Sequence, residues 1–127
     1  MLLLASTSDL LRVVTGSAVT VDVHASWSDL NGTTVTPGRT NTLISTAATT
    51  TVVGSPASST FRSVKTLTAR NRHASSAVDV TVLHTDGTNA VELVKVTLSA
   101  GDALHYDEHN GFTVRDLECA ESSRRWR

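Results

Sequence analysis

Residues 78–98, VDVTVLHTDGTNAVELVKVTL, constrain the fold more than any other stretch of this chain. Valine alternates with other residues over positions 78–83, and a period of two is typical of a β-strand with one buried face. Asp86-Gly87 follows, and this dipeptide favours the positive φ angles of a type I′ turn. The alternation then resumes over residues 90–98. The stretch therefore predicts an antiparallel hairpin that turns at Asp86-Gly87.

The same signals recur along the rest of the chain. Alternating or β-branched runs, each bounded by residues that favour turns, predict further strands, and no segment shows a convincing helical pattern. These runs lie at residues 9–14, 18–27, 42–53, 63–71, 104–108 and 111–116. We therefore predict an all-β protein, an antiparallel β-sandwich or jelly-roll-like barrel of about 6–8 strands.

Composition agrees with this class, because 20 Thr, 15 Ser and 16 Val replace much of the usual apolar and charged content. The length of 127 residues suits one domain. We expect an N-terminal arm or edge strand at residues 1–17, a sandwich domain at 18–116, and a mobile or partner-bound tail at 117–127. Cys119 is the single cysteine, so no internal disulfide is expected.

A core of Val, Ala and Thr buries little area per residue, so its margin over chain entropy is thin. Strand-rich chains of this kind often gain burial from neighbouring subunits. We therefore expect a homo-oligomer, with a trimer as the first candidate. The opening segment MLLLASTSDLL carries five Leu, and we expect part of it to pack on another subunit.

No motif for chemistry stands out, and we predict no catalytic residues, no cofactor and no metal site. In an extended strand one face would carry His105, Asp107 and His109, which could then bind one cation. The favoured interpretation is that they are exposed polar residues at a hairpin tip. The stretches SDLNG and HTDGTN place Asp near Gly, as calcium loops do, yet both lack the full set of oxygen ligands.

The net charge of −1 gives no reason to expect specific nucleic-acid binding or a membrane partner. One basic segment contains Arg62, Lys65, Arg70 and Arg72. Strand alternation predicts that the three arginines share one face and that Lys65 takes the other. We interpret these residues as solvated charges that discourage strand aggregation, with a phosphate site as the alternative. Trp27 is expected in the core or at a subunit seam.

Two stretches, residues 35–88 and 93–116, resemble a group of small proteins encoded in the structural-gene regions of tailed bacteriophages and prophages. The shared pattern is Arg-x-Val-Lys-x-Leu, Arg-Asn, a valine strand with an Asp-Gly turn, and Leu-x-Ala-Gly-Asp-x-Leu-x-Tyr. It is carried by Arg62, Val64, Lys65, Leu67, Arg70, Asn71, Asp86, Gly87, Leu98, Ala100, Gly101, Asp102, Leu104, Tyr106, Phe112 and Asp116. The tail departs from the pattern.

The resemblance implies a non-enzymatic virion component. The first candidate is a capsid decoration, or cement, protein that stabilises the shell by binding the major capsid protein or other virion subunits. The alternative is a head fibre or a head–tail or tail component that acts as a host-surface binding module. A glycan site usually has exposed aromatic side chains or clustered Asp and Asn. Aromatic residues make up only 4% of the chain, so the sequence gives little support to a glycan site.

Overall fold

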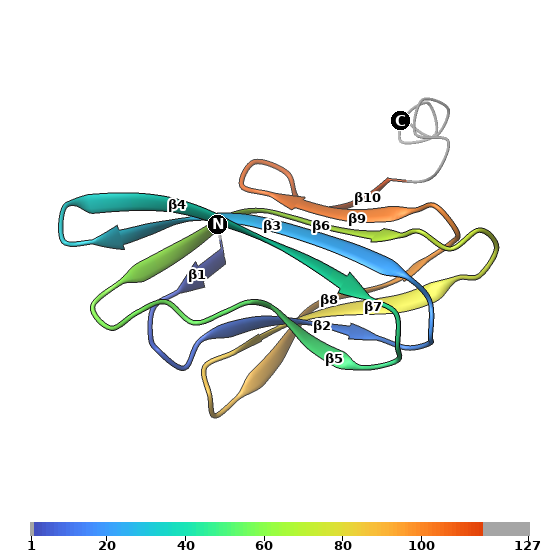
Figure 1. Ribbon diagram of the computed structural model, residues 1–127, viewed down its shortest axis with the longest axis horizontal. Helices are drawn as coiled ribbons and strands as arrows, with labels where there is room; N and C mark the ends of the chain where they lie inside the picture. The colour runs from blue at the N-terminus through green and yellow to red at the C-terminus, as the bar shows by residue number, and fades with distance from the viewer. Residues whose placement is uncertain (1, 116–127) are drawn as a thin grey trace.

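The computed structural model describes residues 2–115, and this part of the chain forms ten β-strands and no helix (Figure 1). The predicted all-β class is confirmed. The strands are β1 (Leu2–Leu4), β2 (Leu10–Thr15), β3 (Val21–Asn31), β4 (Thr34–Ile44), β5 (Thr49–Val53), β6 (Phe61–Asn71), β7 (Val78–Thr85), β8 (Ala90–Leu98), β9 (Ala103–Asp107) and β10 (Gly111–Arg115).

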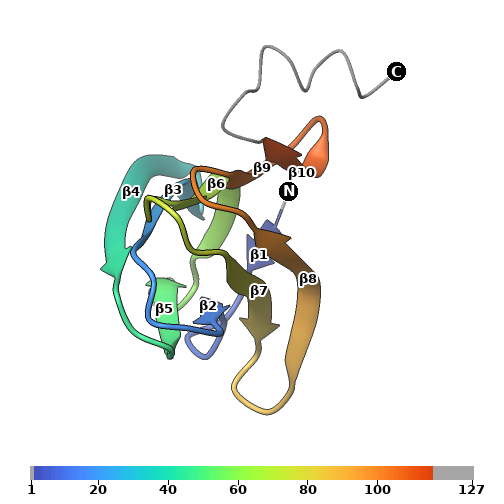
Figure 2. The ribbon, with the colours of Figure 1, turned by 90° about the vertical axis from the view of Figure 1, so that its right-hand side faces the viewer.

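The strands form two open antiparallel sheets that pack face to face as a β-sandwich, rather than the alternative barrel. One sheet has the order β10-β9-β6-β3-β4, and β1 pairs with the first half of β6 as its sixth strand. The other sheet has the order β5-β2-β7-β8. Figure 2 shows the two sheets as separate layers. The β3–β4 hairpin extends beyond the four-stranded sheet (Figure 1).

The core lies between the sheets and is made chiefly of Val and Leu. Alternation explains this, because every second residue of β3 and β7 points inward. The buried apolar residues are Leu4, Leu11, Val13, Val19, Val21, Val23, Ala25, Ile44, Val52, Val53, Val64, Leu67, Ala69, Val78, Val80, Val82, Leu98, Leu104 and Tyr106. Many of them are β-branched, which suits a pleated surface buried on one side.

The N-terminal segment contains one strand with a single partner, β1, and one interior strand, β2, which an arm or edge strand at residues 1–17 did not anticipate. Leu4 and Leu11 are fully buried in the chain's own core, and β2 lies inside the four-stranded sheet between β5 and β7. Asp9 fixes the turn between β1 and β2, because its carboxylate accepts hydrogen bonds from Ala5 N (2.6 Å) and Ser6 Oγ (2.8 Å). Leu4 and Leu11 therefore serve this sandwich, whereas Leu3 is exposed and its packing on another subunit stays a prediction.

The β7–β8 hairpin forms as predicted, but its turn is wider than a type I′ turn. Four residues, 86–89, connect the strands, and only Gly87 among them has a positive φ angle, of 94°. The carboxylate of Asp86 accepts hydrogen bonds from Thr88 N (2.9 Å) and Asn89 N (2.8 Å). This local capping by an Asp side chain takes the place of the two-residue turn that the dipeptide predicted.

The long extended run predicted at residues 42–53 is in fact split between the two sheets. It contains the end of β4 and all of β5, separated by a turn at residues 45–48. The hydroxyl of Thr15 donates a 2.7 Å hydrogen bond to Thr46 O, so the end of β2 is tied to this turn. Threonine favours strands on both sides of the turn, which is why the sequence alone hides it.

A β-bulge at Lys65 changes which side chains of β6 face inward. Ser26 of β3 pairs with Thr66, but the next residue, Trp27, pairs with Val64. Lys65 is the extra residue, so the alternation of β6 reverses there. The prediction that Arg62 and Arg70 share one face is therefore wrong. Arg62 turns toward the inner side, whereas Arg70 stays on the outer face.

Two further findings complete the fold. Within residues 2–115, no helix has the length and apolarity needed to cross a bilayer. The tail at residues 117–127, with Cys119 and Trp126, lies outside the described residues, so its predicted mobile or partner-bound character stays a prediction.

We predict that Gly87→Ala destabilises the fold by about 1–3 kcal/mol, because a side chain at positive φ is strained. A Cβ here would also lie only 2.8 Å from Cβ of Ser8. Gly54→Ala is the matched control, since a Cβ there meets nothing within 4 Å. Denaturant unfolding should separate the two variants, and equal stabilities would contradict the described turn.

We also predict that Asp9→Asn lowers stability in a pH-dependent way. Burial alone would raise the pKa of Asp9, but hydrogen bonds from Ala5 and Ser6 outweigh burial and hold this pKa below its ordinary value. The charged carboxylate therefore stabilises the fold above the unfolded pKa of about 4, and this contribution is lost as pH falls through the lower folded pKa. Unfolding measured from pH 7 to pH 2 should show the difference from wild type shrinking. A constant difference would argue against this role.

Candidate interaction surfaces

The outer face of the six-stranded sheet is a surface on which separate strands bring side chains together. Val21, Val23 and Ala25 point into the core, so the even-numbered residues of β3 point outward. The strand register then places residues of β4 and β6 beside them. This face has an apolar end near the β3–β4 turn and a mainly polar end near residues 22–24, where Leu43 is an exposed apolar residue.

Four exposed apolar residues form the apolar end, which we call the hairpin patch: Leu3, Leu30, Val35 and Phe61. Leu30 pairs with Val35 on one side and with Phe61 on the other, so the three form one row across three strands. Leu3 pairs with Ser63, two residues beyond Phe61. Their exposed fractions are between 43% and 63%, which is unusual for a contiguous apolar set.

The charged residues nearest to the hairpin patch point to the opposite side of the sheet. Arg62 forms a two-pronged ion pair with Asp29, with Nε–Oδ1 at 2.8 Å and Nη2–Oδ2 at 3.0 Å. Its remaining nitrogen donates to Gly54 O at 2.8 Å. This pair is partly buried and well aligned, so it stiffens the base of the hairpin. The patch itself is left without charge.

Trp27 adds to this support from the inner side. The guanidinium carbon of Arg62 lies 4.5 Å from the centre of a Trp27 ring, within cation–π range. On the other side Trp27 lies over Gly38, where a Cβ would come within 2.7 Å of the indole nitrogen. Trp27 packs against the core cluster, which is one of the two placements that the sequence predicted for it.

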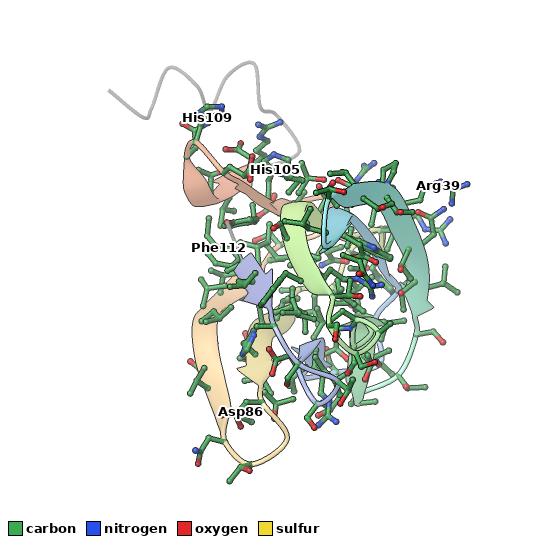
Figure 3. All side chains as sticks on the ribbon, turned by 90° about the vertical axis from the view of Figure 1, so that its left-hand side faces the viewer. Arg39, Asp86, His105, His109 and Phe112 are labelled. Carbon is green, nitrogen blue, oxygen red and sulfur yellow. The ribbon has the colours of Figure 1, made fainter. Side chains whose placement is uncertain are left out.

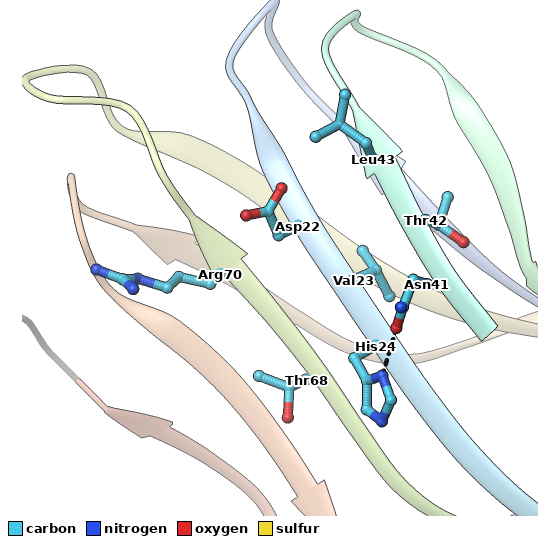
Figure 4. Close-up of a pocket in the computed structure, with 8 residues that line it drawn as sticks. All are labelled: Asp22, Val23, His24, Asn41, Thr42, Leu43, Thr68 and Arg70. Carbon is cyan, nitrogen blue, oxygen red and sulfur yellow. Dashed lines mark hydrogen bonds between the residues drawn. The ribbon is translucent and has the colours of Figure 1, made fainter. Parts of the chain in front are cut away.

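The polar end contains a shallow groove of about 400 Å³. Its polar lining comes from Asp22, His24, Asn41, Thr68 and Arg70, which project from three neighbouring strands (Figure 4). Sequence reasoning did not single out His24, Asn41 or Thr68 as a group, because only the pairing of β3 with β4 and β6 makes them neighbours.

One row of the sheet carries most of the hydrogen-bonding groups at this end. Asn41, His24, Thr68 and His105 are successive partners across β4, β3, β6 and β9. His24 Nδ1 lies 2.6 Å from Asn41 Oδ1, and Thr68 Oγ1 lies 3.0 Å from His105 Nδ1. The row is therefore pre-ordered by its own side chains, which lowers the entropy cost of binding a polar ligand.

The structure brings together two of the three residues weighed as a cation site and sets the third apart. His105 Nε2 lies 3.4 Å from Asp107 Oδ2, but His109 sits at the tip of the β9–β10 hairpin (Figure 3). Asp107 accepts hydrogen bonds from the N–H groups of Asn110 and His109, and these lower its pKa. Among residues 2–115, no three His, Cys, Asp or Glu side chains gather as a metal site would require.

The two Asp-Gly stretches that resemble calcium loops use their carboxylates internally. Asp29 is paired with Arg62, and Asp86 caps its own turn. Hydrogen bonds from the N–H groups of Asn89 and Thr88 lower the pKa of Asp86. Turn formation and ion pairing therefore account for both acids.

Comparison with protein-family models, curated proteins and solved structures finds no match. The structure also shows what many of the residues in the phage-like pattern do. Leu67, Asn71 and Leu104 are buried, Gly101 has a φ of 86°, and Lys65 forms the bulge. These positions maintain the sandwich and its turns, so the pattern describes a fold more directly than it describes a binding site.

We predict that prolonged dialysis against EDTA leaves the melting temperature unchanged, because the carboxylates weighed as ligands already have protein partners. Thermal unfolding before and after dialysis, and after adding Zn²⁺ or Ca²⁺, checks this. A shift of several degrees that His105→Ala abolishes would instead restore the cation site.

Proposed function

We propose that this protein is a structural component of a tailed-phage virion, most simply a decoration protein that binds the major capsid protein and stabilises the shell. The observation that carries the proposal is the hairpin patch, an uncharged apolar surface on a projecting and internally braced hairpin. The likeness of residues 35–116 to phage structural-region proteins supports the same role.

The size of the hairpin patch suits the centre of a protein interface. Four half-exposed apolar side chains present on the order of 300 Å², the range in which such patches are often functional. A standard interface buries roughly 800 Å² per partner, with an apolar centre and a polar rim. Ser28 and Ser63 pair with each other beside the patch and supply rim residues of that kind.

Shell stabilisation would follow from mass action. A chain that binds only the assembled shell lowers the free energy of that state, in proportion to the logarithm of its free concentration over its Kd. We also propose that the chain acts as a homo-oligomer, with a trimer as the first candidate, because linked copies raise the effective concentration of each contact. No catalytic step enters this proposal.

We predict that Val35→Asp greatly weakens binding to emptied capsids, by about tenfold or more, because it places an unpaired charge in the interface. The fold should survive, since Val35 is 63% exposed. Leu43→Asp is the matched control: Leu43 is 64% exposed on the same strand β4, roughly 25 Å from Val35 along the sheet. Co-sedimentation with capsids measures both variants.

The role would be contradicted if both variants bind capsids as the unmodified chain does, or if the unmodified chain fails to bind at all. Light scattering tests the oligomer separately. A chain that stays monomeric at high concentration contradicts the trimer but leaves shell binding to be decided by co-sedimentation.

A further inference from the structure

Three arginines on the outer face of the six-stranded sheet have no ion-pair partner within residues 2–115: Arg39, Arg70 and Arg115. The acids near them are already engaged. Asp22, which lies directly across from Arg70 in the strand register, is paired with Arg72 at 2.9 Å. Asp107 caps the β9–β10 turn, and Asp102 accepts a hydrogen bond from Ser99 N. The polar end of this face therefore carries uncompensated positive charge, although the whole chain has a net charge of −1.

Two of these arginines lie on one row of the sheet with a small residue between them. Ala103 of β9 pairs with Arg70 of β6 on one side and with Arg115 of β10 on the other. Neighbouring strands are about 4.8 Å apart, so the two arginine Cα atoms are roughly 10 Å apart. Arginine side chains are long enough to converge over Ala103. Figure 4 shows Arg70 extending away from Asp22, from β6.

The next row of the same face supplies neutral hydrogen-bonding groups. Thr68, His105 and Thr113 are successive partners across β6, β9 and β10, and His24 and Asn41 continue the row into the groove. A ligand held by the two guanidinium groups would therefore find hydroxyl, imidazole and amide partners about one row away. This combination matches a molecule that bears both an oxyanion and many hydroxyl groups.

We propose that the polar end of this face binds an acidic saccharide, with Arg70 and Arg115 holding a carboxylate above Ala103. The groove row, from Thr68 to Asn41, hydrogen-bonds the adjoining sugar hydroxyls. Guanidinium groups match the planar carboxylate and form paired hydrogen bonds with it. The groove lining has no Phe, Tyr or Trp side chain, which argues against a site for a neutral glycan. In an acidic saccharide, the charged contact with arginine supplies binding energy that stacking on such side chains would otherwise give.

A nucleic acid fits this surface less well. Appreciable affinity for a nucleic-acid backbone takes several phosphate contacts, and single strands also stack on aromatic side chains. The proposed site offers two convergent arginines and no aromatic residue in the groove lining. It also lies roughly 25 Å along β3 from Leu30 of the hairpin patch. The inference therefore does not depend on shell binding, and each can fail without the other.

The test uses the full chain and two defined probes, the acidic trisaccharide trigalacturonate and the neutral trisaccharide maltotriose, titrated at low ionic strength and followed by calorimetry. We expect trigalacturonate to bind and maltotriose not to bind. Arg70→Gln and Arg115→Gln should each weaken trigalacturonate binding about tenfold, as expected for loss of a charge-assisted hydrogen bond. Both side chains are exposed, so melting temperatures should stay close to wild type.

Arg39→Gln is the matched control. Arg39 lies on β4, at the opposite edge of the same sheet from His105 (Figure 3), so this substitution removes the same charge away from the proposed site. It should change the Kd less than twofold. Equal weakening by all three substitutions would show general charge attraction and overturn the site. Absence of trigalacturonate binding at millimolar concentration would also overturn it, as would tighter binding of a DNA oligonucleotide that depends on Arg70 and Arg115.

Discussion

Asn71 is the polar residue on which one end of the sandwich depends. Its side chain is fully buried, its amide nitrogen donates to Ser76 O (2.8 Å) and Leu98 O (3.0 Å), and its carbonyl oxygen accepts from His73 N (3.0 Å). Its backbone also bonds to the turn at residues 99–102. One side chain thus joins the end of β6 in one sheet to the end of β8 in the other. Each of these buried groups would cost about 1–3 kcal/mol if left unpaired.

The opposite end of the sandwich is closed by a different device. Arg62 bridges Asp29, Gly54 and the Trp27 ring, so the inner side of the projecting hairpin is held by an ion pair and an aromatic contact. With the charges engaged on the inner side, the outer side is left apolar. The bulge at Lys65 makes this division, since it turns Arg62 inward while Arg70 remains outside. The proposed shell contact and the proposed saccharide site thus occupy opposite ends of one sheet face.

Local patterns predicted much of the fold and little of the surface. Alternation located the strand at residues 63–71 and the hairpin at 78–98, because side-chain period depends only on neighbours in sequence. It missed the reversal at Lys65 and the interior position of β2, which depend on pairing between distant strands. The hairpin patch was missed for the same reason. Its four apolar residues come from three distant segments of the sequence, and only the register of four strands brings them together.

The order of strand pairing has a consequence for synthesis of the chain. β1 pairs only with β6, and β2 finds its partners in β5 and β7, so the first fifteen residues emerge long before their neighbours. Contacts this distant in sequence make folding slow and leave strand edges open in the meantime. The five early leucines, buried or half-covered in the finished sandwich apart from Leu3, are thus exposed in the nascent chain. The period of greatest aggregation risk ends only when β7 has been made and can pair with β2.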